Sequence, residues 1–160
     1  MRVTIRFATP ADADTLHAFI TGLAVYEREP DAVLVTPAVL REQLAAARPP
    51  FECLLAEHDG VARGFALFFA TYSTWRGRPG IWVEDLFVPE AHRRRGVGRA
   101  LLRRLAQLAL ERGCARLEWS VLDWNAPALG FYRTLGAQAL DQWTIHRLCD
   151  APLAALAAEA

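Results

Sequence analysis

The sequence predicts a mixed α/β fold in which helices flank a central mixed, mostly antiparallel sheet. Two strand-like runs, 51–58 and 61–72, are joined by Asp59-Gly60, which is a strong signal for an antiparallel hairpin. Further along, a long helix pattern at 97–112 connects strand-like runs at 81–88 and 115–121, and such a crossover joins parallel strands. A chain with both kinds of connection needs a mixed sheet with helices packed against it.

The elements are expected in the order β-α-α-β-β-β-α-β-α-β. Alternating hydrophobic residues predict strands, and apolar residues at a spacing of three to four predict helices. Thr9-Pro10 and Thr36-Pro37 begin the first two helices, since threonine caps a helix and proline suits its first position. Further strands are expected at 3–7 and 143–149, and a short helix at 126–135.

Chain length and composition indicate one compact domain. The chain has 160 residues, of which 53% are hydrophobic, enough for a core. We expect a single domain at 1–150, followed by an alanine-rich tail at 151–160 that is a weak helix or frayed.

The charge balance and the cysteines exclude several functional classes. The 18 basic and 18 acidic residues give a net charge of zero, which argues against nucleic-acid binding. No secretory leader or membrane-spanning run is apparent, so no membrane partner and a cytoplasmic location are expected. Cys53, Cys114 and Cys149 form no metal-binding pair, so no metal is predicted.

The turn at Arg93–Gly98 has the features of an anion site. It follows the strand at 81–88 and opens the helix at 97–112. The first amides of a helix lack intrahelical partners, glycines allow close approach of a phosphate, and arginine donors match phosphate oxygens. The turn matches neither the Walker pattern nor the dinucleotide-binding pattern. Taken without its neighbours, it could also be an ordinary helix start with a solvated run of basic residues.

Two further motifs flank this turn. Val83-Glu84-Asp85-Leu86-Phe87-Val88 precedes it, and Asp123-Trp124-Asn125-Ala126-Pro127, with Phe131-Tyr132 and Gly136-Ala137, follows it. With Arg93-x-x-Gly96-x-Gly98 they resemble the GNAT superfamily of N-acetyltransferases over essentially the whole chain. The resemblance implies a GNAT-like fold with a βαβ cofactor-binding core.

Shorter strings resemble one branch of that superfamily. Tyr26-Glu27, Thr71–Trp75, Glu84-Asp85 and Leu122–Asn125 are similar to the diamine (spermidine/spermine) and thialysine acetyltransferases. Ser73 stands where the polyamine enzymes carry an aspartate, and this departure speaks against a polyamine preference.

The resemblance implies acetyl-CoA as co-substrate. Backbone N–H groups of the strand end would bind the pantetheine arm and the acyl oxygen, and the helix start would bind the pyrophosphate. The expected cofactor-binding residues are Leu86, Phe87, Val88, Arg93, Arg94, Arg95, Gly96, Val97, Gly98, Arg99, Asn125, Pro127, Ala128 and Tyr132.

Acetylation of an amine needs a proton acceptor and a proton donor. We expect Glu84, a carboxylate within an apolar strand where burial is expected, to accept the ammonium proton, with a water between them. We expect Tyr132 to protonate the departing thiolate. An ion pair with an arginine is the alternative for Glu84, and simple packing is the alternative for Tyr132.

Substrate-pocket candidates are aromatic or acidic, since such groups suit an alkylammonium ion. They are Tyr26, Glu27, Trp75, Glu84, Asp85 and Trp119. Because Glu84 and Asp85 are adjacent in a strand, they should point to opposite faces unless a bulge intervenes.

The predicted function is acetyl transfer from acetyl-CoA to a primary amine of a small molecule, such as a diamine, polyamine or lysine-like compound. Direct attack in a ternary complex is favoured, since no cysteine carries a catalytic signature. Alternatives are acetylation of protein N-termini or lysines, and a non-catalytic acyl-CoA sensor. Relatives in the resembling branch imply a homodimer.

Overall fold

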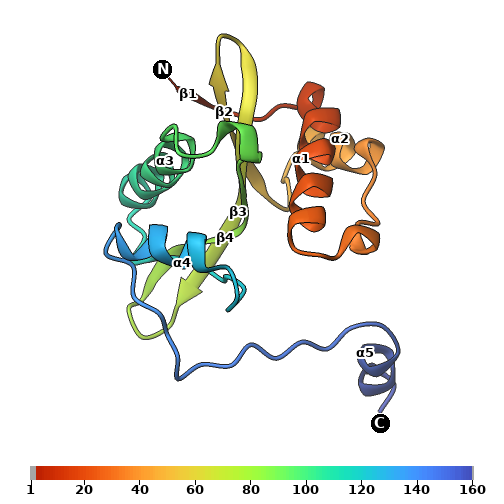
Figure 1. The fold of residues 1–160 in the computed structure, drawn as a ribbon. Coiled ribbons are helices and arrows are strands. Elements are labelled where there is room, and N and C mark those ends of the chain that lie inside the picture. Colours follow the sequence, from red (N-terminus) through yellow and green to blue (C-terminus); the bar gives the residue numbers. More distant parts are fainter. Residues whose placement is uncertain (1–2, 160) are drawn as a thin grey trace. The chain divides into compact units, whose positions relative to one another are not determined.

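The computed structural model describes residues 3–159, which fall into two compact units that divide between Ser120 and Val121. The first unit is built on a five-stranded sheet (Figure 1). Its strands are β1 (Thr4–Phe7), β2 (Glu52–His58), β3 (Val61–Ser73), β4 (Arg78–Phe87) and β5 (Leu117–Trp119), paired in that order. Only β4 and β5 are parallel, which confirms the predicted mixed, mostly antiparallel sheet.

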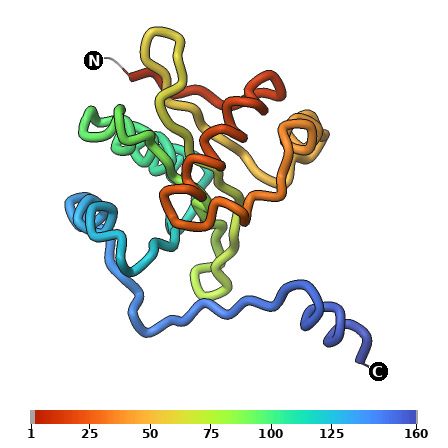
Figure 2. The backbone as a smooth tube through the Cα atoms, turned by 45° about the vertical axis from the view of Figure 1, so that its right-hand side comes forward, coloured from red at the N-terminus to blue at the C-terminus, as the bar shows by residue number. Residues whose placement is uncertain are grey.

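Helices cover both faces of this sheet. On one face lie α1 (Ala13–Tyr26) and α2 (Pro37–Ala45), and on the other lies α3 (Val97–Glu111) (Figures 1 and 2). Short 3₁₀ turns at Pro10–Asp12, Pro30–Ala32 and Glu90–His92 lead into α1, α2 and α3. The succession β4-α3-β5 is the crossover that the sequence predicted.

Two hydrophobic cores hold the layers together. Towards α1 and α2, the side chains of Leu16, Leu40, Phe65 and Phe87 are buried in one cluster, and the ring of Phe19 stacks on Phe65 at 5.7 Å between centroids. Towards α3, the stripe that the sequence predicted is buried, namely Leu101, Leu105, Leu108 and Ala109. Burial of such side chains contributes about 1.5–3 kcal/mol each.

A close approach of β3 to the end of β4 depends on Gly64. A Cβ at this position would lie 2.8 Å from the carbonyl oxygen of Phe87 and 3.2 Å from a methyl group of Val97. A side chain at residue 64 would therefore push β3 away from the end of β4 and from the start of α3, the two elements that carry the predicted cofactor residues.

The second unit contains two helices, α4 (Ala126–Arg133) and α5 (Asp150–Ala157). The Oδ1 atom of Asn125 caps α4 by accepting from the Ala128 N–H at 3.3 Å. The strand predicted at 143–149 is wrong for the folded chain, because no strand forms there. An isolated strand is unstable without a partner for its N–H and C=O groups, and this segment pairs with no strand of the described chain.

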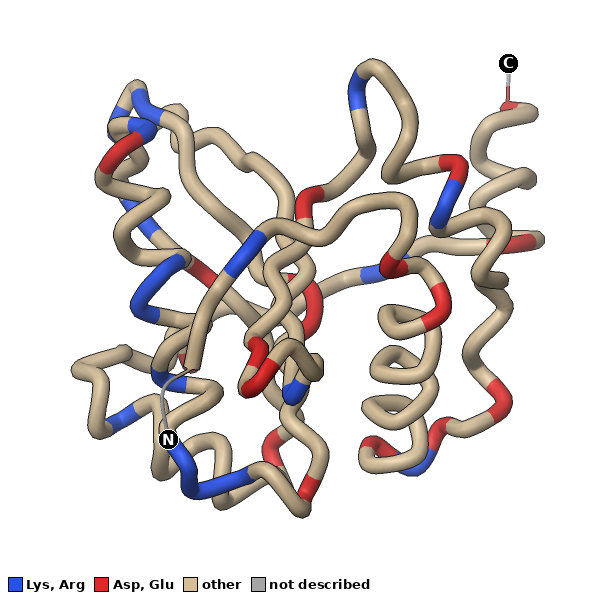
Figure 3. The backbone as a smooth tube through the Cα atoms, turned by 90° about the horizontal axis from the view of Figure 1, so that it is seen from above, with Lys and Arg blue, Asp and Glu red and all other residues tan. Residues whose placement is uncertain are grey.

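The distribution of charged residues and the hydropathy of the helices agree with what the composition indicated. Acidic and basic positions are interspersed along the chain (Figure 3). Among the helices of residues 3–159, none combines the length and the apolar character that a membrane span requires.

Candidate functional site

The parallel strands β4 and β5 part at the centre of the candidate site. Their pairing ends at Val83 and Trp119, whereas β4 continues beside β3 up to Phe87, which pairs with Phe65. The last residues of β4 therefore have β3 on one side and lie beyond the end of β5 on the other. Leu86 and Phe87 lie in this stretch, as required for strand amides that bind an extended ligand.

A β-bulge brings the two neighbouring carboxylates to one face. Val83 pairs with Phe68 and Asp85 pairs with Leu67, so Glu84 is the extra residue. Asp85 thereby shares the face of Leu67, which packs in the core below α1. Glu84 and Asp85 were expected to point to opposite faces of the sheet unless a bulge intervened, and this bulge is present.

Trp82 fixes the orientation of Glu84. Its indole Nε1 donates to Glu84 Oε2 at 2.9 Å. Trp82 pairs with Phe69, which lies two residues from Leu67 on β3, so Trp82 lies on the same face of the sheet as Leu67. The sequence motifs did not point to Trp82 as a functional residue. The available signal was its position two residues before Glu84 in a predicted strand, which places both side chains on one side of the sheet in the absence of a bulge.

The carboxylates differ in burial, in a way that the sequence did not predict. Glu84 was expected to be buried but is exposed, whereas Asp85 is half-buried. Burial, and then the nearby charges of Glu84 and Glu27, raise the pKa of Asp85 to about 6. Burial also raises the pKa of Glu27, which ends α1. The charges of Glu84 and Glu27 therefore both act on the carboxyl group of Asp85, and a bound cation would relieve this repulsion.

Arg93 ties the end of α1 to the end of β4. Its guanidinium carbon lies 4.4 Å from the centroid of the Tyr26 ring, and its Nε donates to the carbonyl oxygen of Val88 at 2.9 Å. This contact holds Tyr26 and the neighbouring Glu27 next to the site. The structure thus gives Arg93 a positioning role that the sequence did not reveal.

The start of α3 has the backbone shape expected of an anion site. Gly96 caps the helix with φ 81°, in the left-handed region that glycine tolerates best, and Arg94 also has a positive φ of 59°. Val97 is buried, whereas Arg94, Arg95 and Arg99 are exposed. The first amides of this 15-residue helix have no partner within the helix and form the positive end of its dipole.

The remaining predicted residues of the first unit lie in different environments. Trp119 is half-buried where β5 ends, opposite Val83. Trp75 is 90% exposed at the tip of the turn between β3 and β4. Ser73 is buried, and its Oγ accepts from the Arg76 N–H at 3.2 Å, so this side chain stabilises the turn.

The predicted residues of the second unit gather on α4. Asn125 is buried at its N-terminus, Pro127 and Ala128 lie in its first turn, and Tyr132 is half-buried in its last turn. The Tyr132 ring lies 5.6 Å from that of Phe131. Capping by Asn125 confirms the structural role that the sequence allowed for it.

The described residues 3–159 contain no cluster of three or more side chains that could hold a metal ion. Cys53 is buried in the core, and this burial raises the pKa of its thiol far above its usual range. A protonated, enclosed thiol is a poor nucleophile.

The opened sheet and the glycine-capped helix beside it fit one class of enzyme, the acetyltransferases, and comparison with known families supports this class. The family model described as the acetyltransferase (GNAT) family matches residues 16–137, and the chain belongs to this family.

Relatives with known names agree with this assignment. Thialysine N-epsilon-acetyltransferase of Bos taurus is 35% identical over 148 residues, covering 88% of this chain and 86% of the relative. L-ornithine N5-acetyltransferase of Arabidopsis thaliana is 30% identical, covering 95% of this chain and 86% of the relative. An integron cassette protein of V. cholerae has the same fold, with a TM-score of 0.83, 23% identity and 99% coverage of both chains.

The raised pKa of Asp85 predicts a pH-dependent gain from Asp85→Asn. Since the folded-state pKa of about 6 exceeds the ordinary 3.8, the ionised carboxyl destabilises the fold increasingly as pH rises from about 4 to 6. The variant should therefore unfold with a larger free energy than wild type at pH 8, by at most about 3 kcal/mol, and with nearly the same free energy at pH 4.

Urea denaturation at both pH values measures this difference. Asp31→Asn, at an exposed carboxylate in the turn before α2, is the control and should show no such trend. A difference between wild type and Asp85→Asn that does not grow with pH would show that the Asp85 pKa is not raised.

Proposed function

We propose that this enzyme transfers the acetyl group of acetyl-CoA to a primary amine of a small molecule, by direct attack in a ternary complex. The observation that carries the proposal is the carboxyl cluster of Glu27, Glu84 and Asp85 beside the parted strands. The names of two relatives, a thialysine N-epsilon- and an L-ornithine N5-acetyltransferase, support an amino acid with a side-chain amine as acceptor.

The acidic cluster suits an acceptor that arrives as an ammonium ion. An alkylamine has a pKa of roughly 10.4 and is protonated at neutral pH. The carboxyl groups of Glu27 and Asp85 would stabilise that cation, and the Tyr26 ring, held by Arg93, would form one wall. Trp119 and Trp75 are further candidates for contact with the acceptor.

Glu84 is the proposed proton acceptor, with one water between its carboxylate and the ammonium group. It is exposed, as a group that passes protons to solvent must be, and the indole N–H of Trp82 holds one of its oxygens. Loss of the ammonium proton frees the nitrogen lone pair for attack. Direct attack is proposed over an acyl-enzyme because none of the three cysteines lies in a catalytic signature, and the thiol of Cys53 is moreover buried.

Tyr132 is the proposed proton donor. Its phenol would give a proton to the departing thiolate, whose unperturbed pKa is near 8.5, and would regain it from water. Asn125, Pro127 and Ala128 are proposed to bind the same co-substrate from α4.

Acetyl-CoA supplies the acetyl thioester, and the residues present fit its charged and extended parts. Gly96 and Gly98 give the start of α3 an uncrowded backbone for the pyrophosphate, with Arg94, Arg95 and Arg99 exposed around it. The amides of Leu86, Phe87 and Val88 would bind the extended arm along the part of β4 that β5 does not reach. No metal is part of the proposal.

Three further predictions from the sequence accompany this function. They are the homodimer, the cytoplasmic location, and the absence of nucleic-acid and membrane partners. The neutral net charge supports the lack of a nucleic-acid partner.

A screen of amines with acetyl-CoA tests the proposed function. Thiol release should accompany lysine-, thialysine- or ornithine-like acceptors, with a kcat/KM at least tenfold above that for peptides bearing a free N-terminus or lysine. Preference for peptides would favour a protein acetyltransferase. Binding of acetyl-CoA without thiol release for any acceptor would favour a sensor.

Glu84→Gln should lower kcat by about 10²- to 10⁴-fold at neutral pH, the usual contribution of a general base. The loss should shrink towards high pH, where more of the acceptor is already deprotonated in solution. Glu90→Gln, an exposed carboxylate in the turn before α3, is the control. Unchanged turnover across the pH range would remove Glu84 from the mechanism.

Tyr132→Phe should lower kcat by about 100-fold or more with little change in KM for acetyl-CoA, because only the phenolic proton is lost. Steady-state kinetics with thiol detection measure both constants. Tyr72→Phe, at an exposed tyrosine on β3, controls for loss of a hydroxyl elsewhere. Full turnover of Tyr132→Phe would leave this residue a packing role.

A further inference from the structure

Trp82 lies in the last part of β4 that is paired on both sides. It pairs with Phe69 of β3 and with Glu118 of β5, and its side chain is half-buried. The pairing with β5 ends one residue later, at Val83. Neighbouring strands therefore hold Trp82 on both sides, so it is a fixed point from which a nearby side chain can be positioned.

Glu84 is much less constrained by its own strand. It is the extra residue of the bulge, it follows the end of the pairing with β5, and its side chain is exposed. A glutamate side chain is long and flexible, and an exposed one visits several rotamers unless an interaction selects one of them. A carboxylate at this position needs a neighbour that keeps it in one geometry.

The indole of Trp82 supplies this constraint. Its Nε1 donates to Glu84 Oε2 at 2.9 Å, a usual length for a hydrogen bond. An indole nitrogen only donates, so it needs an acceptor. The other carboxylate beside Trp82 belongs to Glu118, which forms an ion pair with Arg116 Nε at 2.7 Å. Glu84 is thus the carboxylate that receives the indole N–H.

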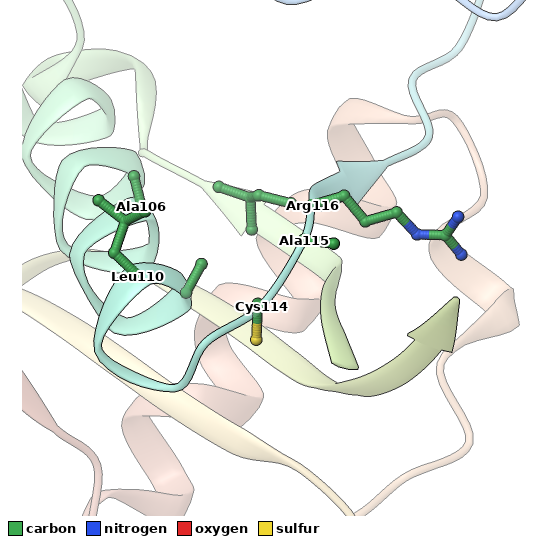
Figure 4. Close-up of a pocket in the computed structure, with 7 residues that line it drawn as sticks. Ala106, Leu110, Cys114, Ala115 and Arg116 are labelled. Atoms are coloured by element: carbon green, nitrogen blue, oxygen red, sulfur yellow. The ribbon is translucent and has the colours of Figure 1, made fainter. Parts of the chain in front are cut away.

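The two faces of the sheet differ at Trp82. Ile81 pairs with Leu117, which lines an apolar groove of about 250 Å³ between the end of α3 and β5 (Figure 4). Successive residues of a strand point to opposite faces, so the side chain of Trp82 lies on the face away from this groove. That face is shared with Leu67 and Asp85. Trp82 therefore belongs to the acidic side of the sheet, where the acceptor amine is proposed to bind.

We propose that Trp82 is a positioning residue for the proton transfer and that it selects the oxygen of Glu84 that acts. Because the indole N–H holds Oε2, Oε1 is the oxygen that takes the proton. An oxygen that already accepts a hydrogen bond is the poorer proton acceptor of the two. This role rests on the proposed function, since it presupposes that Glu84 is the proton acceptor.

The proton then has a defined route. One N–H bond of the acceptor ammonium breaks, its proton passes to the bridging water, and the water gives one of its own protons to Oε1. The electron pair of the broken bond stays on nitrogen and attacks the thioester carbonyl. Glu84 is exposed, so the proton leaves Oε1 for solvent before the next turnover. Trp82 keeps its N–H throughout and serves neither as acid nor as base.

A double-mutant cycle tests this role, with thiol release measured on thialysine or L-ornithine, whichever gives the higher kcat/KM. Trp82→Phe keeps an aromatic ring on β4 and removes the N–H. It should lower kcat by about 10- to 100-fold, as misplacement of a catalytic group does, and leave KM for acetyl-CoA nearly unchanged. In the Glu84→Gln enzyme the same change should lower kcat by less than about twofold, because no base is left to position.

Trp143→Phe, at a tryptophan that is 69% exposed, is the matched control and should leave kcat unchanged. Equal losses from Trp82→Phe with and without Glu84 would show that Trp82 only packs, and full turnover of Trp82→Phe would show that it has no part in the reaction. Either result overturns the positioning role while the proposed function stands. Unchanged turnover of Glu84→Gln would instead overturn the proposed proton acceptor, and the role of Trp82 with it.

The indole N–H signals report the contact itself, without any acetyl transfer. The chain has five tryptophans, each with one indole signal in a proton–nitrogen correlation spectrum. The signal that disappears in Trp82→Phe belongs to Trp82, and the backbone signals of the same spectrum show whether this variant is folded. In Glu84→Ala the Trp82 proton signal should move upfield, farther than the other indole signals, because its acceptor is lost. A Trp82 signal that stays in place would overturn the inference.

Discussion

The irregular end of β4 is the constraint on which the rest of the site depends. Up to Val83 the strand pairs on both sides, and beyond it only β3 remains as a neighbour. The bulge at Glu84 falls at this same point and turns two successive carboxylates to one face. Loss of regular pairing thus frees backbone groups and re-aims acidic side chains in one short stretch.

Neighbouring elements hold this irregular strand in place. Gly64 lets β3 approach the end of β4 closely, and Arg93 bridges the Tyr26 ring and the carbonyl oxygen of Val88. A half-buried carboxyl with a pKa near 6 at Asp85 destabilises the free protein at neutral pH. Binding of a cation next to Asp85 would offset this loss of stability, which fits the proposed acceptor that arrives as an ammonium ion.

The sequence by itself determined the mixed fold, most element positions and the acetyltransferase family, because hairpin, capping and glycine signals are local and lie in a specific order. Tertiary structure decided what depends on pairing. The bulge at Glu84, the burial of Asp85 instead of Glu84, and the role of Trp82 arise from register between strands. The segment 143–149 has the hydrophobic pattern of a strand yet forms none. The pattern reflects only the local preference of the segment, whereas a strand also requires a neighbouring strand to pair with.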